Sequence, residues 1–160
     1  MIDGVKIKKL NVHKDIPDTD EPVEKEGYLM EVLRDDDGLL TKFGQTTFTV
    51  AYPGTIKAFH WHKKQDDLWF FSSGKAVVVL YDMREDSPTY GETQEIVCDA
   101  ENYPQLILIP IGVAHGYKVL GNEPAHLLYH VTESYKADSP DEERIAYDDE
   151  KIGYDWDKHN

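Results

Sequence analysis

Three histidines and one aspartate form a pattern that could bind a metal ion or move protons. His60 and His62 are two residues apart, Asp67 follows five residues after His62, and His115 lies in a later segment. Residues two apart on a β-strand point to the same face, so His60 and His62 are predicted to share one surface. Imidazole and carboxylate together suit Zn, Mn or non-haem Fe, and a neutral imidazole also accepts a proton near pH 7. These four side chains are therefore the candidate site, and lining a polar pocket is the purely structural alternative.

The segments around these residues have the composition of short β-strands. Val, Ile, Thr and aromatic residues dominate them, and clusters of Asp, Asn, Gly and Pro separate them. No segment has the apolar periodicity of a long helix. The predicted strands cover 2–12, 28–33, 45–52, the histidine segment after 54, 68–71, 75–81, 94–98, 105–109, 114–120 and 125–132, with a loop at 14–22, one short helical turn at 39–43 and an acidic tail of surface loops at 135–160. Many short strands at regular spacing predict an all-β sandwich or jelly roll.

The length and charge of the chain limit its class. At 160 residues it is expected to form a single domain, residues 1–160, with a proper core. Lys and Arg number 17 against 31 Asp and Glu, which gives a net charge of −14. Nucleic acids and anionic membranes attract basic surfaces, so neither partner is expected. The lone Cys98 forms no internal disulfide and the N-terminus lacks the apolar run of a signal peptide, so we expect a cytoplasmic protein.

The candidate residues also resemble the two sequence motifs of the cupin superfamily. The first motif is matched by Gly54, His60, His62, Asp67 and Gly74, with Asp where Glu is usual, and the second by Pro110, Gly112 and His115. This resemblance implies a double-stranded β-helix, the cupin jelly roll. In metal-dependent cupins three histidines and a carboxylate hold one divalent transition-metal ion. On that interpretation the metal ligands are His60, His62, Asp67 and His115.

A longer resemblance covers residues 27–156. Residues 82–91 read Asp-Met-Arg-Glu-Asp-Ser-Pro-Thr-Tyr-Gly after a predicted strand. Further matches are Gln105-Leu106, the segment 109–116, Tyr129, Tyr135, the segment 145–149 and Asp155-Trp156, with Gln45 fifteen residues before His60. Together these residues resemble the dTDP-4-dehydrorhamnose 3,5-epimerase family, which shares the cupin jelly roll and normally works without a metal.

This resemblance implies an isomerase of carbohydrate and polysaccharide biosynthesis that acts on a nucleotide-linked 4-keto-6-deoxy sugar without a cofactor. The enzyme would remove a proton next to the ketone and return one to the other face of the sugar ring. His60 stands at the position of the base and Tyr129 at the position of the acid. Inversion requires these groups on opposite sides of the ring. The candidate substrate-binding residues are Gln45, Lys57, His62 and His115.

Three departures from the family remove electrostatic support from the base and from an enolate. Lys57 replaces an arginine, which keeps the charge but loses bidentate geometry. Asp67 falls where the family has an oxyanion-stabilising lysine, so the change removes an epimerase group and supplies a metal ligand. The aspartate that orients the base in the family belongs to a C-terminal segment that has no counterpart in this sequence. A metal-dependent cupin, enzyme or binder, is therefore the alternative function.

Two further interpretations follow from resemblance. The run His60-Trp-His-Lys-Lys is similar to sugar-nucleotide 3,4-ketoisomerases, in which paired histidines are the acid and the base, so His62 is also a candidate catalytic group. A third possibility is a non-catalytic sugar-binding jelly roll, because fold alone does not prove function. Family members are usually homodimers, and the N-terminal strands within 1–34 are expected to pair with a partner's sheet, since an exposed edge strand is otherwise a liability.

Overall fold

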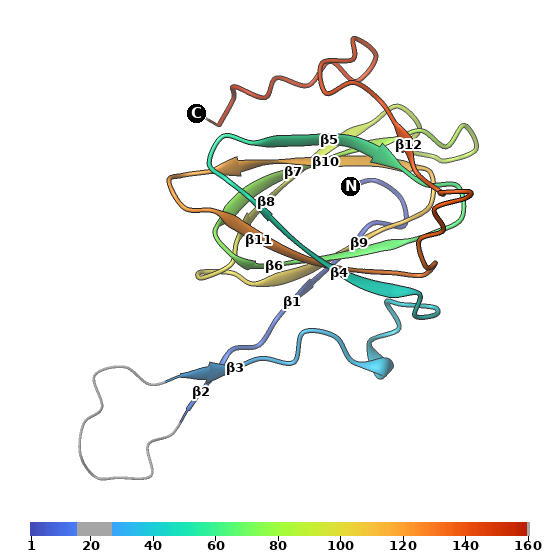
Figure 1. The fold of residues 1–160 in the computed structure, drawn as a ribbon. Helices are drawn as coiled ribbons and strands as arrows, with labels where there is room; N and C mark the ends of the chain where they lie inside the picture. The colour runs from blue at the N-terminus through green and yellow to red at the C-terminus, as the bar shows by residue number, and fades with distance from the viewer. Residues whose placement is uncertain (16–26, 160) are drawn as a thin grey trace, which may run out of the picture.

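Two antiparallel five-stranded sheets face each other in the computed structural model, which describes residues 1–15 and 27–159 (Figure 1). The first sheet contains, in spatial order, β1 (Lys6–Lys9), β9 (Gln105–Ile109), β6 (Asp67–Ser73), β11 (Ala125–Val131) and β4 (Gln45–Ala51). The second contains β12 (Glu143–Arg144), β5 (Ile56–Trp61), β10 (Val113–Leu120), β7 (Lys75–Asp82) and β8 (Thr93–Asp99). The all-β jelly roll predicted from the sequence is confirmed.

The space between the sheets has an apolar half and a polar half. Side chains alternate between the two faces of each strand, so every second residue points inward. On β6, Phe71 belongs to the main apolar cluster, Asp67 lines a pocket, and Trp69 between them belongs to the cluster and also lines the pocket. On β10, Val119 lies in the same cluster and His115 in the same pocket. Each strand thus contributes both to the core and to the site.

The outer faces of both sheets are also covered. Phe70, Leu68 and Leu106 of the first sheet pack against apolar side chains of the segment 30–40. The second sheet packs its outer face, including Phe59, against the C-terminal residues Ile152 and Trp156. Burial on both faces explains why residues 76–82 on β7 form an unbroken buried run rather than an alternating one.

The C-terminal segment differs from the surface loops that we expect at 135–160. Residues 143–144 form strand β12, which pairs with β5 and extends the second sheet. Further along, Trp156 is buried, and its backbone carbonyl accepts a hydrogen bond of 2.6 Å from the buried Lys118 ammonium. Composition does not predict this strand, because its two residues are both charged and exposed.

The helical turn expected at 39–43 is wrong. Within the described residues the short 3₁₀ helix η1 lies earlier, at Asp35–Asp37. The Asp37 carboxylate accepts a hydrogen bond of 2.9 Å from the Arg34 backbone N–H, and Gly38 ends the turn in the left-handed region at φ 62°. Side-chain capping and a glycine with positive φ fix the turn at this position.

The motif at 82–91 serves the fold. The buried Asp82 carboxylate accepts hydrogen bonds from Arg84, Ser87 and Thr89 at 2.6–2.8 Å. Burial alone would raise the pKa of Asp82, but these donors outweigh it and hold the pKa well below the ordinary value of a carboxyl. Arg84 also donates to the Asp3 carbonyl at 2.7 Å. The motif therefore fastens the N-terminal residues to the barrel.

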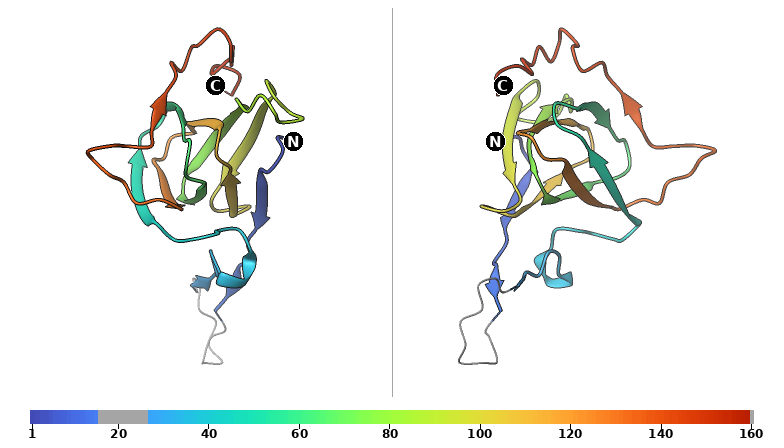
Figure 2. Two further views of the ribbon diagram at one scale, coloured as in Figure 1. Left: turned by 90° about the vertical axis from the view of Figure 1, so that its right-hand side faces the viewer. Right: turned by 60° about the vertical axis from the view of Figure 1, so that its left-hand side comes forward.

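Beyond β1 the chain leaves the barrel as an arm. The hairpin of β2 (His13–Lys14) and β3 (Tyr28–Leu29) stands away from the two sheets in all three views (Figures 1 and 2). The loop predicted at 14–22 falls mostly on residues 16–26, which lie outside the described residues. None of the helices described in 1–15 and 27–159 is long and apolar enough to span a membrane.

Candidate active site

The polar half of the barrel interior encloses a pocket of about 880 Å³. Its walls come from both sheets and from the chain after β11. The residues proposed from the sequence all line it: Gln45, Lys57, His60, His62, Asp67, His115 and Tyr129. The structure thus brings together side chains that are up to 84 positions apart, between Gln45 and Tyr129. Their roles remain predictions, and their common location is an observation.

Close contact between β10 and β5 places two of the histidines on adjacent strands. His115 lies opposite His60 in the antiparallel register, and the register shifts between His115 and Tyr117. A Cβ at Gly116 would overlap Ala58 on the neighbouring strand. Glycine at 116 is therefore required for the two strands to approach, and the irregularity re-aims the side chains beside it.

His60 is oriented by a carboxylate that the sequence analysis missed. The His60 Nδ1 atom lies 3.1 Å from Glu142 Oε1, and Arg144 donates to the same oxygen at 3.0 Å. Burial raises the pKa of Glu142, but the contacts with Arg144 and His60 outweigh it and lower this pKa, so the carboxylate is ionised. Glu142 reaches His60 because Arg144 on β12 pairs in register with His60 on β5.

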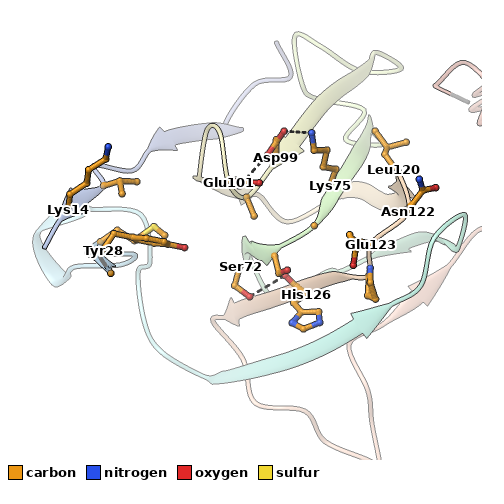
Figure 3. Close-up of a pocket in the computed structure, with 18 residues that line it drawn as sticks. Lys14, Tyr28, Ser72, Lys75, Asp99, Glu101, Leu120, Asn122, Glu123 and His126 are labelled. Atoms are coloured by element: carbon orange, nitrogen blue, oxygen red, sulfur yellow. Dashed lines mark hydrogen bonds and ion pairs between the residues drawn. The ribbon is translucent and has the colours of Figure 1, made fainter. Parts of the chain in front are cut away.

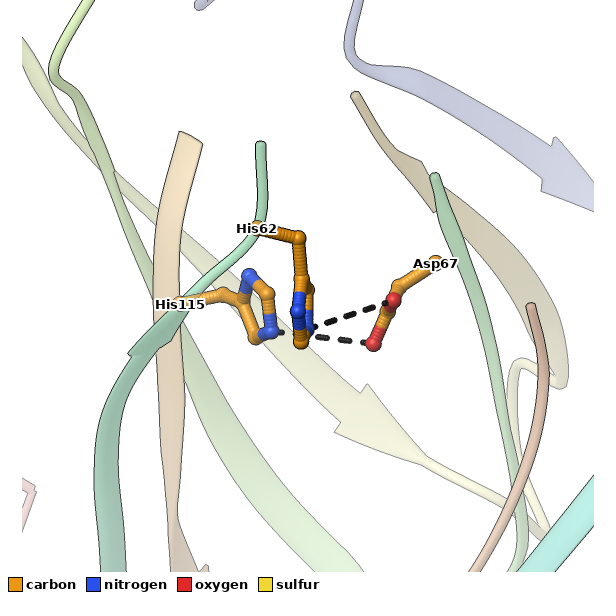
Figure 4. A group of neighbouring side chains, drawn as sticks. All are labelled: His62, Asp67 and His115. Atoms are coloured by element: carbon orange, nitrogen blue, oxygen red, sulfur yellow. Dashed lines mark ion pairs between the residues drawn. The ribbon is translucent and has the colours of Figure 1, made fainter. Parts of the chain in front are cut away.

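A second cluster contains His62, Asp67 and His115, which are all buried (Figure 4). The Nε2 atoms of His62 and His115 each lie 3.6 Å from a different oxygen of the Asp67 carboxylate. Burial lowers the pKa of His115 to about 4, although Asp67 opposes this shift, and the ring is therefore neutral at pH 7. Among the described residues, the ligand atoms of these three side chains lie within 4.8 Å of one another, and His60 is not part of this group.

Tyr129 stands on the wall opposite His60. It belongs to β11 of the first sheet, where Thr47 on the adjacent strand β4 is its register partner, and its ring packs against Trp69. Burial raises the pKa of Tyr129, and the nearby carboxylates add to the shift, so the phenol keeps its proton at neutral pH. A protonated hydroxyl inside the pocket can donate to a bound molecule.

The two remaining candidates hold the walls of the pocket. Lys57 donates to the Thr49 hydroxyl at 2.9 Å, so its ammonium lies against β4. The Gln45 carboxamide accepts a hydrogen bond of 2.7 Å from the Tyr135 backbone and donates to Thr47 at 3.2 Å. Gln45 therefore fixes the segment after β11 at the pocket mouth.

The charge of the pocket differs from that of the whole chain. Its lining carries four basic side chains, Lys57, Lys64, Lys136 and Arg144, and four acidic ones, Asp67, Glu133, Asp141 and Glu142. The net charge of the protein is −14. An anionic ligand therefore meets less repulsion from the balanced formal charges of this lining than the net charge of the chain suggests.

A pocket lined by imidazole, phenol and carboxylate groups, set inside a jelly roll, provides the side chains that proton transfer requires. A sequence model described as dTDP-4-dehydrorhamnose 3,5-epimerase matches residues 2–160, and the chain belongs to this family. It is a sugar-nucleotide epimerase, which is a kind of isomerase.

Two curated relatives match nearly the whole chain. The spore coat polysaccharide biosynthesis protein SpsL of Bacillus subtilis is 54% identical over 156 residues, covering 98% of this chain and 97% of that protein. The probable low-salt glycan biosynthesis epimerase Agl13 of Haloferax volcanii is 39% identical over 149 residues, with coverages of 91% and 95%.

Solved structures share the same fold over almost the full length. A dTDP sugar isomerase from Desulfovibrio desulfuricans superposes with a TM-score of 0.85 and 26% identity, covering 99% of this chain and 94% of that one. The 3,5-epimerase RmlC of Legionella pneumophila, in complex with dTDP-4-keto-L-rhamnose, gives a TM-score of 0.80 and 28% identity, with coverages of 97% and 79%.

Proposed function

We propose that this protein inverts a ring carbon next to the ketone of a nucleotide-linked 4-keto-6-deoxy sugar, within polysaccharide biosynthesis. The observation that carries the proposal is the position of His60 and Tyr129 on opposite sheets, facing one pocket. The names of the relatives, which refer to spore coat polysaccharide and glycan biosynthesis, support the biological context. The Legionella epimerase with a bound dTDP-4-keto sugar supports the substrate class.

The proposed step moves one proton off the sugar and another onto it. His60 Nε2 takes the proton from the carbon beside the ketone, and the electron pair of the broken C–H bond forms an enolate. Glu142 accepts the Nδ1–H of His60 and so fixes the ring with Nε2 toward the pocket. Tyr129 returns a proton to the opposite face of the same carbon, which inverts it. Both groups then re-equilibrate with solvent, and the sugar changes only its configuration.

The dimensions and charges of the pocket suit such a substrate. A volume of about 880 Å³ lies in the range of small-molecule sites, roughly 300–1,000 Å³. The basic side chains Lys64, Lys136 and Arg144 offer partners for a diphosphate. The proton transfers use side chains alone, in keeping with a family that generally needs no cofactor.

Isotope exchange tests the proposal directly. Incubation with a dTDP-4-keto-6-deoxy sugar in deuterated water should introduce at least one ring deuterium, measured by mass spectrometry, and NMR should place it beside the ketone. dTDP-glucose, which has no ketone, is the matched control and should gain none. Absence of deuterium with dTDP-, UDP-, GDP- and CDP-linked 4-keto sugars would contradict the proposal. Tight binding without exchange would instead indicate the non-catalytic jelly roll.

We also infer that two copies associate through the N-terminal arm. The hairpin exposes Val12, Tyr28 and Leu29, and a cavity of about 1,210 Å³ separates it from the loops of its own barrel (Figure 3). Large exposed apolar side chains on a projecting hairpin are suited to contact a second chain.

Sedimentation analysis should give a mass twice the chain mass of 18.4 kDa. The double substitution Tyr28→Glu with Leu29→Glu should reduce the measured mass to that of a single chain. Tyr52→Glu, at another exposed aromatic, should leave the mass unchanged. A monomeric unmodified protein would exclude this arrangement.

A further inference from the structure

The cluster of His62, Asp67 and His115 has an arrangement that the proposed proton transfers leave unexplained. Each Nε2 atom faces the Asp67 carboxylate across 3.6 Å, and the ligand atoms of the three residues lie within 4.8 Å of one another (Figure 4). The relative exposures are 8%, 3% and 2%, respectively. Three polar groups therefore converge in a space that is almost closed to solvent.

The hydrogen bonds of the two rings fix their tautomers. His62 Nδ1 contacts the Asp141 carbonyl, and His115 Nδ1 lies 2.9 Å from the Val113 carbonyl. A carbonyl oxygen only accepts hydrogen bonds, so both Nδ1 atoms carry the proton. Nε2 is therefore the ring nitrogen left to bind a ligand, and in both histidines it faces the Asp67 carboxylate.

The carboxylate is held in the same way. Gln65 Nε2 donates to Asp67 Oδ1 at 2.8 Å, and Trp69 Nε1 donates to Oδ2 at 3.1 Å. These two donors fix the orientation of the carboxylate between the two rings. Two Nε2 atoms and a carboxylate thus face one another, an arrangement of donor atoms that suits a cation placed between them.

The separations indicate which positive charge fits. A distance of 3.6 Å is too long for a hydrogen bond, so a proton shared between a ring and the carboxylate does not bridge it. A metal ion bound at about 2.0–2.2 Å in tetrahedral geometry sets neighbouring ligand atoms about 3.3 Å apart. Ring N–H groups bound to carbonyls are also the usual support of metal-bound histidines.

We propose that His62, Asp67 and His115 bind one divalent first-row transition-metal ion. Two imidazoles and one carboxylate are a known donor set for Fe(II) with open coordination positions, and the same ligands suit Zn and Mn. His60 is not among the residues whose ligand atoms lie within 4.8 Å of one another, so it is available to the proposed epimerisation. The ion would supply positive charge in the pocket at the position where the family resemblance places a lysine. Metal binding itself does not depend on the proposed function.

Metal content measures the site without reference to activity. The full chain, purified without an affinity tag and stripped with a chelator, is titrated separately with Zn²⁺, Mn²⁺, Fe²⁺ and Co²⁺ under reducing conditions. Elemental analysis after gel filtration should find about one ion per chain for at least one metal. The Co²⁺ form should show visible absorption bands, and the preferred metal should raise the melting temperature, because it binds the folded state.

Substitutions locate the ion. Asp67→Asn, His62→Ala and His115→Gln should each weaken binding more than 10-fold and remove the melting-temperature rise, with circular dichroism confirming the fold. His126→Gln, at a histidine outside this pocket, is the matched control and should bind like the unmodified protein.

Two outcomes would overturn the proposal. One is less than about a tenth of an ion per chain with all four metals, which would leave a bridging water or a protonated ring in the cluster. The other is full occupancy in the Asp67→Asn variant. A protein that binds the metal but shows no deuterium exchange would refute only the proposed function, and a protein that exchanges deuterium but binds none of the four metals would refute only the metal site.

Discussion

Deuterium exchange in the keto sugar should fall about 10³-fold when His60 is replaced by asparagine, because positioned general bases contribute roughly 10²–10⁴-fold. The substitution removes Nε2 as the proton acceptor while keeping a side chain of similar polarity at the half-buried site. Initial rates of deuterium uptake, followed by mass spectrometry at saturating substrate, measure the effect. The melting temperature should change little, since the His60 side chain belongs to none of the apolar clusters.

The Glu142→Gln variant tests how much the charge of Glu142 contributes to proton removal by His60. Glutamine still accepts a hydrogen bond from Nδ1 but carries no charge, so exchange should slow by about 10–100-fold with little change in KM. His126→Asn should match the unmodified enzyme. If His60→Asn exchanges at the normal rate, another group is the base. If Glu142→Gln changes only the melting temperature, Glu142 supports the fold rather than the proton transfer.

Loss of the Tyr129 hydroxyl should uncouple exchange from inversion. In Tyr129→Phe, His60 still removes the proton and can return deuterium to the same face, but nothing returns one from the opposite wall. Formation of the epimer should therefore fall about 10²-fold or more, while deuterium continues to enter the unconverted substrate. NMR of the sugar ring distinguishes retained from inverted carbon and so reports both rates in one sample.

A second pocket tyrosine provides the control for this experiment. Tyr117 lies on β10, in the same sheet as His60, and also lines the pocket. Tyr117→Phe should keep the normal ratio of inversion to exchange. Normal inversion in Tyr129→Phe would assign the acid to a different group, and equal loss of exchange and inversion would point to substrate binding as its role.

The strands of this fold were predictable from composition because their residues are the ones that strands require. Val, Leu and Tyr side chains in β7 and β10 are buried on both faces, so their local preference agrees with their environment. The histidines could be assigned to one site because spacing by two residues and two short motifs constrain them. Pairing of distant strands then placed them in one pocket with Tyr129.

The contacts of the site could not be predicted in the same way. Glu142 lies 82 residues from His60, and only the pairing of the two-residue strand β12 with β5 brings it there. Neither residue of β12 has strand-like composition. The separation of His60 from the cluster of His62, Asp67 and His115 depends on side-chain hydrogen bonds, which leave no periodic signal in the sequence.

The division of the barrel interior has a consequence for how such proteins diversify. Along β6 and β10, Phe71 and Val119 belong to the apolar core alone and Asp67 and His115 to the pocket alone, whereas Trp69 and Tyr117 between them belong to both. Substitutions at Asp67 or His115 therefore leave the side chains of the apolar core unchanged. A lineage with this architecture can acquire new sugar preferences through a few neighbouring substitutions, without having to rebuild its scaffold.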